Sequence, residues 1–250
     1  MVRLVDTDLE RPQLTAAIDE ALLDSRVADR SGDTIHLYRR RPASVSIGYF
    51  QEAAMVADLE ACRRDGVPVV RRLSAGGAIF TDERQLVYAI VHRPKGSLGA
   101  REGLALACKA LVRAMGALGV DGARMEGDND VMVGDRKVSG SAQKVRRGVH
   151  LVHGTVLVDV DMDAVSMYLR PPRAARDGME RPTPERRITT LAAVMGSPPP
   201  MGHVKAAVAE ELARAMGGAP EPADLSEEEA GEALRLERER YSSDGWNLRR

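Results

Sequence analysis

The sequence predicts an α+β fold in which a mixed β-sheet forms the core and several helices cover it. Segments with apolar residues at helical spacing are interspersed with short β-branched runs, and a block of β-like segments with glycine turns lies in the middle of the chain. Only 3% of the 250 residues are aromatic, so the core has to be built mainly from aliphatic side chains. We expect one domain that spans residues 1–250.

Helices are expected where apolar side chains recur every three or four residues. The strongest pattern is Arg101–Leu118, where Gly119 follows as a favourable C-terminal residue. The pattern also predicts helices at Gln13–Val27, Met55–Arg64, Met162–Leu169, Gly202–Met216 and Ser226–Tyr241.

Strands are expected in the β-branched runs that turn residues interrupt. The turns Gly134-Asp135 and Arg147-Gly148 predict hairpins among the central strands. The segment Arg170–Glu185 is rich in proline and arginine and exceeds the usual connection length, so we expect a mobile loop there. The predicted strands are Thr34–Arg39, Ser44–Tyr49, Val67–Arg72, Leu86–His92, Val131–Val133, Lys137–Val145 and Val149–Val158.

The charge and the apolar runs argue against several classes of protein. A net charge of −1 gives no electrostatic reason to expect nucleic acid or an anionic membrane as a partner. No apolar run approaches the length of a membrane-spanning helix, and acidic residues occupy the N-terminus where a signal peptide would be apolar. We therefore expect a soluble, cytoplasmic protein. Its two cysteines, Cys62 and Cys108, fall in predicted helices and are expected to be buried free thiols.

An arginine pair precedes a glycine-rich turn in the segment Arg71-Arg72-Leu73-Ser74-Ala75-Gly76-Gly77-Ala78-Ile79-Phe80. Backbone N–H groups of such a turn can converge on a phosphate because no Cβ atoms block the approach. No Gly-Lys-Ser/Thr follows, so the turn is not a Walker loop. On the turn alone, an ordinary hairpin with surface arginines is the simpler interpretation.

A single lysine, Lys137, is followed by the small residues Ser139, Gly140, Ser141 and Ala142. A lone lysine on a strand is usually a solvated charge. Here small neighbours would let a ligand approach the backbone, and the polar run Asp128-Asn129-Asp130 precedes the strand. His153-Gly154-Thr155 lies on a run that can pair with it. A lysine in this setting can neutralise a phosphate and stabilise charge that develops on a carbonyl during acyl transfer.

Together these segments resemble the lipoate–protein ligase A family, which shares a superfamily with biotin ligases and octanoyl transferases. The matching motifs follow one another in the family's order along nearly the whole chain. They are Ser46–Gln51, Arg71–Phe80, Asn129-Asp130-Val131, Arg136–Ala142, His153-Gly154-Thr155 and Tyr241–Asn247. The resemblance implies a biotin/lipoyl ligase-like catalytic domain.

The resemblance also implies a two-step reaction with ATP, Mg²⁺ and lipoate. Lipoate would first become lipoyl-AMP, and the lipoyl group would then pass to a lysine of a lipoyl domain of 2-oxoacid dehydrogenases or of the glycine-cleavage H protein. Lys137 would contact the carbonyl and phosphate of the adenylate as the catalytic residue.

Further roles follow from the same resemblance. Arg72 and the backbone of Gly77–Phe80 would hold the nucleotide phosphates, and Arg71 and Ser74 would flank the acyl chain. Asn129 and Asp130 would position the adenylate, with Asp130 as a candidate metal ligand, and His153 would line the pocket. The implied binding residues also include Gly76, Gly77, Ala78, Ile79, Phe80, Gly140, Ala142 and Gly154.

Two departures from the family pattern affect this expectation. The family turn has three glycines after the serine, whereas this chain has Ala75 first, which is tolerable if that residue keeps a negative φ. The chain also stops four residues after Trp246 and resembles archaeal-type members without a C-terminal accessory domain. We therefore expect a separate accessory subunit to be needed for adenylation.

The nearest alternative is an octanoyl or lipoyl transferase that acts from acyl carrier protein through a cysteine thioester. No cysteine lies between Gly119 and Asp130, on the approach to the lysine strand, which disfavours it. A biotin ligase would carry a Gly-Arg-Gly-Arg loop, which is absent. The alternative outside the enzymes is a catalytically weak paralogue that binds lipoyl domains. Lipoate and octanoate are not separable from the sequence, because such small apolar differences give little discrimination.

Overall fold

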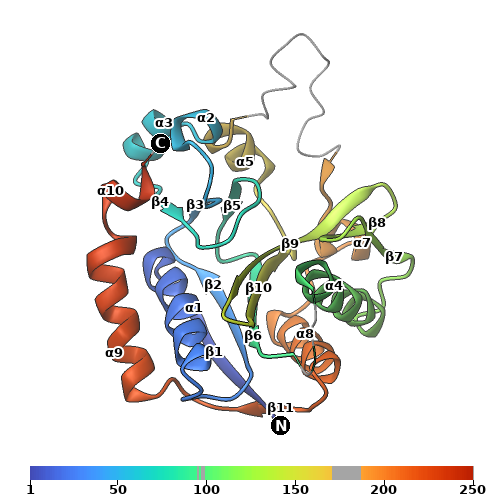
Figure 1. The fold of residues 1–250 in the computed structure, drawn as a ribbon. Helices are drawn as coiled ribbons and strands as arrows, with labels where there is room; N and C mark the ends of the chain where they lie inside the picture. Colours follow the sequence, from blue (N-terminus) through green and yellow to red (C-terminus); the bar gives the residue numbers. More distant parts are fainter. Residues whose placement is uncertain (95, 97–98, 171–186, 250) are drawn as a thin grey trace.

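The computed structural model describes residues 1–94, 96, 99–170 and 187–249 (Figure 1). An eight-stranded sheet forms its centre, in the order β11-β1-β2-β6-β10-β9-β8-β7. β1 runs parallel to β2 and to β11, and the other neighbouring strands are antiparallel. The strands are β1 (Val2–Glu10), β2 (Thr34–Arg40), β6 (Leu86–His92), β7 (Ala123–Glu126), β8 (Asp130–Val133), β9 (Arg136–Arg146), β10 (Val149–Val156) and β11 (Pro220–Pro222).

Helices cover both faces of this sheet. α4 (Ala100–Ala117) and α8 (Met201–Ala215) pack on one face, where Leu111 and Leu212 join the same buried cluster as strand residues such as Ile90. α1 (Pro12–Val27) and α9 (Glu227–Leu236) cover the other face (Figure 1). The end of α9 continues into a π-helical segment, Glu237–Tyr241.

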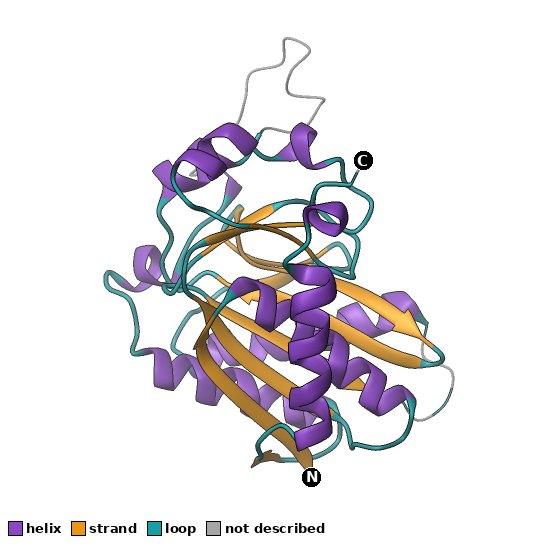
Figure 2. Ribbon diagram, turned by 90° about the vertical axis from the view of Figure 1, so that its left-hand side faces the viewer, coloured by secondary structure: helices purple, strands orange, loops and turns teal. Residues whose placement is uncertain are grey.

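A smaller sheet, β4-β3-β5, stands at the end of the molecule away from the N-terminus (Figure 2). It forms a third hydrophobic cluster with the short helices beside it, with Val45, Ile47 and Phe80 at its centre. The elements are β3 (Ser44–Ile47), β4 (Val69–Arg71), β5 (Ile79–Thr81), α2 (Ala53–Val56), α3 (Leu59–Arg64) and α5 (Met162–Tyr168). α10 (Asp244–Asn247) lies beside β4, and α7 (Leu191–Met195) contributes Leu191 to the core of the large sheet.

The predicted α+β class with a mixed sheet and covering helices is confirmed. The single helix predicted over Met55–Arg64 is wrong, because the chain forms two helices there. Ala57 is extended and forms a β-bridge with Leu169, and Asp58 starts α3 by accepting a hydrogen bond from the N–H of Ala61. The predicted loop Arg170–Glu185 lies, after its first residue, outside the described residues.

No helix within the described ranges is long and apolar enough to cross a membrane.

An ion pair between Arg3 on β1 and Glu229 on α9 ties the sheet to its covering helix, and it should make stability depend on pH. Burial would raise the pKa of Glu229, but the hydrogen bonds from Arg3 and from the Ser226 N–H outweigh it and lower the pKa from 4.5 to about 2. Because the pKa of Glu229 is lower in the folded protein, its ionisation stabilises the fold at pH values above the unfolded-state pKa of 4.5. This stabilisation is lost as the pH falls from 4.5 to about 2.

Glu229→Gln is therefore expected to lower the free energy of unfolding by about 2 kcal/mol at pH 7. The difference from the parent protein should shrink toward zero near pH 2, as urea titrations at both pH values would measure. Equal destabilisation at both pH values would contradict this assignment.

Candidate active site

The glycine turn Ser74–Ala78 joins β4 to β5 and lies directly against another backbone segment. A Cβ atom added at Gly48 would be 2.1 Å from the carbonyl oxygen of Gly76, so only glycine fits at that position. The N–H of Tyr49 donates to the carbonyl of Ser74 across the same contact (2.8 Å). The segment after β3 therefore packs directly against the turn through Gly48 and Tyr49.

Arg72 fixes the shape of the turn from within. Its Nη2 donates to the carbonyls of Ala75 and Gly77 (both 2.8 Å), and its Nε donates to Ser74 Oγ (3.0 Å). The side chain is buried, and burial lowers the pKa of its guanidinium to about 10, which leaves it charged at neutral pH. Arg72 thus gathers the carbonyls of the turn on one side.

The turn also carries hydrogen-bond donors that no described residue engages. In the described part of the chain, no hydrogen bond engages the N–H groups of Ala75, Gly76 and Gly77. Gly76 adopts φ +97°, whereas Ala75 is not among the described non-glycine residues with positive φ. The methyl group of Ala75 is therefore accommodated. Unengaged N–H groups of a glycine turn beside a buried guanidinium are suited to binding an anion.

Lys137 lies at a β-bulge that turns its side chain toward Gly140. The pairing of β8 with β9 passes from Val131↔Ser139 to Met132↔Lys137, so one residue is skipped and the side-chain direction changes. The Lys137 Nζ is 2.7 Å from Asp130 Oδ2. A Cβ added at Gly140 would be 3.4 Å from the Cδ of Lys137 and 3.7 Å from that Nζ, so the lysine side chain lies directly over the glycine.

The structure brings the two motifs together through β9 and β10. A Cβ added at Gly76 would lie 3.6 Å from the Cβ of Ala142. Ala142 pairs with His153 on β10, and His153 Nε2 is 2.6 Å from Ser74 Oγ. Gly140 lies on the same strand, two residues before Ala142. The glycine turn and the lysine segment therefore border one face of the sheet.

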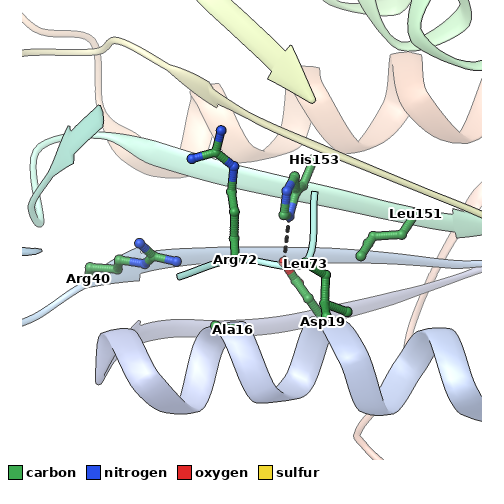
Figure 3. Close-up of a pocket in the computed structure, with 7 residues that line it drawn as sticks. All are labelled: Ala16, Asp19, Arg40, Arg72, Leu73, Leu151 and His153. Atoms are coloured by element: carbon green, nitrogen blue, oxygen red, sulfur yellow. Dashed lines mark hydrogen bonds and ion pairs between the residues drawn. The ribbon is translucent and has the colours of Figure 1, made fainter. Parts of the chain in front are cut away.

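A buried polar network links His153 to Asp19 on α1 (Figure 3) and, through Asp19, to His36 and Tyr38 on β2. His153 Nδ1 is 2.9 Å from Asp19 Oδ2, and the other carboxylate oxygen is 2.9 Å from His36 Nδ1. Tyr38 also donates to Asp19 Oδ2 (3.2 Å). Burial would raise the pKa of Asp19, but the hydrogen bonds from the two histidines outweigh it and hold the pKa below its usual range.

A cavity of about 10 Å³ adjoins this network, bordered by Asp19, Arg40, Arg72 and His153 together with Ala16, Leu73 and Leu151 (Figure 3). That volume corresponds to about one water molecule. The polar groups on its wall can supply the hydrogen bonds that a buried water requires.

Arg71 occupies a different place from Arg72. Its fully buried guanidinium donates to backbone carbonyls of the loop after β3 and of the C-terminal segment, which are those of Gly48, Tyr49, Gln51, Trp246, Asn247 and Arg249. The geometry supports a role in holding these two segments together. The expected contact of Arg71 with an acyl chain stays a prediction.

The other expected site residues divide between the site face and the core. Asn129 is anchored to Ser141, with its Nδ2 3.3 Å from that carbonyl. Gly154 permits close packing, because an added Cβ would be 2.4 Å from the carbonyl of Gly140. Phe80 is buried in the small sheet, where its ring stacks on Tyr168 at 5.6 Å, while Ile79 and Ala78 are half-buried beside it.

Both cysteines are buried free thiols, as expected. Cys108 nevertheless packs nearer the lysine strand than its position in α4 suggested, with Sγ 3.7 Å from Ser141 Oγ. Burial raises the pKa of each thiol to about 11, so neither forms a thiolate readily at neutral pH.

Sequence reasoning assigned Asp19 no role, and it included Gly48 only as part of the motif Ser46–Gln51. A signal for Asp19 was present, since an acidic pair, Asp19-Glu20, interrupts the apolar stripe of a helix that packs on the sheet. Gly48 gave no separate signal, because its role depends on a contact with a turn that lies far along the chain.

A protein-family model described as the lipoyl protein ligase A/B catalytic domain matches residues 11–213. Octanoyltransferase LipM of Symbiobacterium thermophilum is 33% identical over 273 aligned residues, which cover 99% of this chain and 98% of that protein. A putative lipoate-protein ligase A of Aeropyrum pernix is 36% identical over 160 residues, which cover 64% of this chain and 59% of that protein.

Solved structures show the same fold. The bipartite lipoate protein ligase of Thermoplasma acidophilum, described with its E2 lipoyl domain, matches with a TM-score of 0.85 and 27% identity. The match covers 100% of this chain and 96% of that one. An ATP-bound lipoate-protein ligase A gives a TM-score of 0.85 at 24% identity, covering 98% of each chain.

Proposed function

The chain belongs to the lipoyl protein ligase A/B catalytic domain family, and on that premise we propose that it transfers a lipoyl or octanoyl group to a lysine of a lipoyl domain. The observation that carries the proposal is that Lys137 and the glycine turn lie along the same face of β9, at Gly140 and at Ala142. This arrangement offers a cation for an acyl carbonyl and N–H donors for a phosphate, the two groups that an acyl adenylate joins.

In the proposed mechanism, the ε-amino group of the acceptor lysine attacks the acyl carbonyl carbon. Negative charge grows on the carbonyl oxygen, and the Lys137 ammonium group stabilises it. The C–N bond then forms fully while the bond to the leaving phosphate breaks. The N–H groups of Ala75, Gly76 and Gly77 donate hydrogen bonds to the departing phosphate and stabilise its negative charge, and the proton released by the amine passes to solvent.

Two acyl donors are compatible with this chemistry, and different observations favour each. The curated relatives that match along nearly their whole length are named octanoyltransferases, which supports the transferase alternative better than the ATP-dependent ligase. The thiols favour the adenylate, because Cys62 and Cys108 are buried and their pKa values are raised to about 11. We propose the adenylate as the donor and octanoyl transfer as the second candidate.

The side chains near Lys137 supply only part of the ligands that a divalent cation bound with ATP would need. Asp130 Oδ1 is buried without a hydrogen-bond partner among the described residues and can serve as one carboxylate ligand. Mg²⁺ commonly binds one or two carboxylates together with phosphate oxygens. No cluster of three acidic, histidine or cysteine side chains occurs in the described ranges, so phosphate oxygens and water would complete the shell. The cation would neutralise phosphate charge during activation of the acid.

The donor can be tested by measuring the mass of a lipoyl-domain acceptor after incubation with the protein. We expect a lipoyl adduct when lipoyl-AMP is supplied directly. With ATP, Mg²⁺ and lipoate, the adduct should form only when a separate accessory subunit is also supplied. Replacing both cysteines by serine should leave transfer from lipoyl-AMP within about twofold of the parent, because no thiolate takes part.

The opposite pattern identifies the second candidate. Transfer from an octanoyl carrier-protein thioester without ATP, together with a covalent adduct on Cys62 or Cys108, would establish a thioester mechanism. If the lipoyl domain binds but gains no mass with any of the acyl donors, both proposals are wrong. The protein then binds lipoyl domains without modifying them.

A further inference from the structure

Asp19 lies outside the glycine turn, yet its carboxylate reaches the turn through one histidine. The oxygen Oδ2 accepts from His153, whose other nitrogen contacts Ser74 Oγ at 2.6 Å. The oxygen Oδ1 faces His36, whose Nε2 is 2.9 Å from the hydroxyl of Thr7 on β1. A chain of hydrogen bonds therefore runs from β1 to the turn, with Asp19 at its centre.

The chemistry of the partners fixes the direction of these hydrogen bonds. An ionised carboxylate only accepts, so the Nδ1 atoms of both histidines must carry protons. A neutral ring with a proton on Nδ1 has an unprotonated Nε2, which accepts a hydrogen bond. The hydroxyl of Ser74 then donates to His153, while its oxygen accepts from Arg72 Nε (3.0 Å). Each donor meets an acceptor in this arrangement.

We propose that Asp19 is a positioning residue for the glycine turn: it holds His153 in the Nδ1–H tautomer, so that Nε2 anchors the Ser74 hydroxyl. With the reverse tautomer, the unprotonated Nδ1 of His153 would face the Asp19 carboxylate, and its Nε2–H would face Ser74 Oγ. The Ser74 hydroxyl would lose this acceptor, and the side chain that opens the turn would rotate. The inference relies on the proposed function only for assigning the turn to a substrate phosphate.

The tautomer can be measured directly by ¹H–¹⁵N NMR of the imidazole nitrogens. The chain has five histidines, and the signals of His153 can be assigned with a His153→Gln variant. We expect the parent protein to show a protonated Nδ1 and an unprotonated Nε2 at neutral pH. A proton on Nε2, either alone or together with one on Nδ1, would overturn the proposal.

Two substitutions at Asp19 separate positioning from a general structural role. In Asp19→Asn, an amide oxygen can replace Oδ2, which faces two donors, His153 and Tyr38, while the amide NH₂ faces His36. His153 keeps its acceptor, so affinity for lipoyl-sulfamoyladenosine, a stable mimic of lipoyl-AMP, should stay within about threefold of the parent. Asp19→Leu removes the acceptor, and we expect about tenfold weaker binding by calorimetry.

A Thr7→Val variant serves as the control. It removes only the hydrogen bond between Thr7 and His36, at the end of the hydrogen-bond network away from the turn, and should leave affinity for the mimic unchanged. Equal weakening by the asparagine and leucine variants, with His153 unchanged in its NMR spectrum, would overturn the positioning role. Failure of the parent protein to bind the mimic would instead count against the proposed function. In that case the NMR result still decides the role of Asp19, because it requires no ligand.

Discussion

Replacing Lys137 by alanine is expected to lower the rate of acyl transfer from lipoyl-AMP by about 10²–10³-fold, the usual loss when one stabilising group is removed from a developing oxyanion. Lys137 lies at a bulge, and its side chain passes over Gly140, where an added Cβ would be 3.4 Å from its Cδ and 3.7 Å from its Nζ. Its loss removes the positive charge assigned to the carbonyl oxygen and leaves Asp130 without its ion-pair partner. The acceptor mass measured over time gives the rate.

Lys109→Ala provides the matched control, since it removes one positive charge from an exposed position on α4. Its transfer rate should equal that of the parent protein. A Lys137→Ala variant that folds normally and transfers at more than a tenth of the parent rate would remove Lys137 from the proposed mechanism.

Gly48→Ala should both destabilise the protein and disable the glycine turn. An added Cβ would be 2.1 Å from the carbonyl oxygen of Gly76 and 3.3 Å from the carbonyl carbon of Ala75, and backbone atoms cannot rotate aside as a side chain can. Overpacking of this kind costs about 2–3 kcal/mol, which corresponds to a fall in Tm of roughly 4–12 °C for a chain of this size. The turn must also move, so affinity for lipoyl-sulfamoyladenosine should fall by at least about tenfold.

The matched substitution for stability is Gly77→Ala in the same turn, where an added Cβ meets no atom within 4 Å. Its Tm should stay within about 2 °C of the parent value. If both variants melt at the same temperature, the close contact between Gly48 and the turn does not constrain the fold.

The elements with strong periodicity were predictable, and those defined by distant partners were not. The helix that became α4 and the strands β9 and β10 carry their patterns within a single segment. β11 has three residues, two of them proline, and it is a strand only because β1 lies beside it. The break between α2 and α3 likewise depends on Leu169, more than a hundred residues away.

For the candidate site, the segments could be located from the sequence, but the contacts of the individual side chains could not. Small residues around a charge are visible without a structure, which made Lys137 and the glycine turn candidates, and the family resemblance gave them their expected roles. The adjacent arginines could not be separated in this way. Arg72 clamps the turn, whereas Arg71 holds the C-terminal segment, and the alternation of side chains along a strand implies only that two adjacent residues point to different sides.

The position of Arg71 has a consequence for the order in which the protein folds. Its acceptors in the C-terminal segment are 175 to 178 positions away along the chain. Until that segment arrives, the guanidinium cannot be both buried and fully paired, since an unpaired buried charge is strongly unfavourable. Contacts of such long sequence separation form slowly. The loop beneath the glycine turn should therefore become protected from amide hydrogen exchange late in refolding, after the hairpin of β9 and β10.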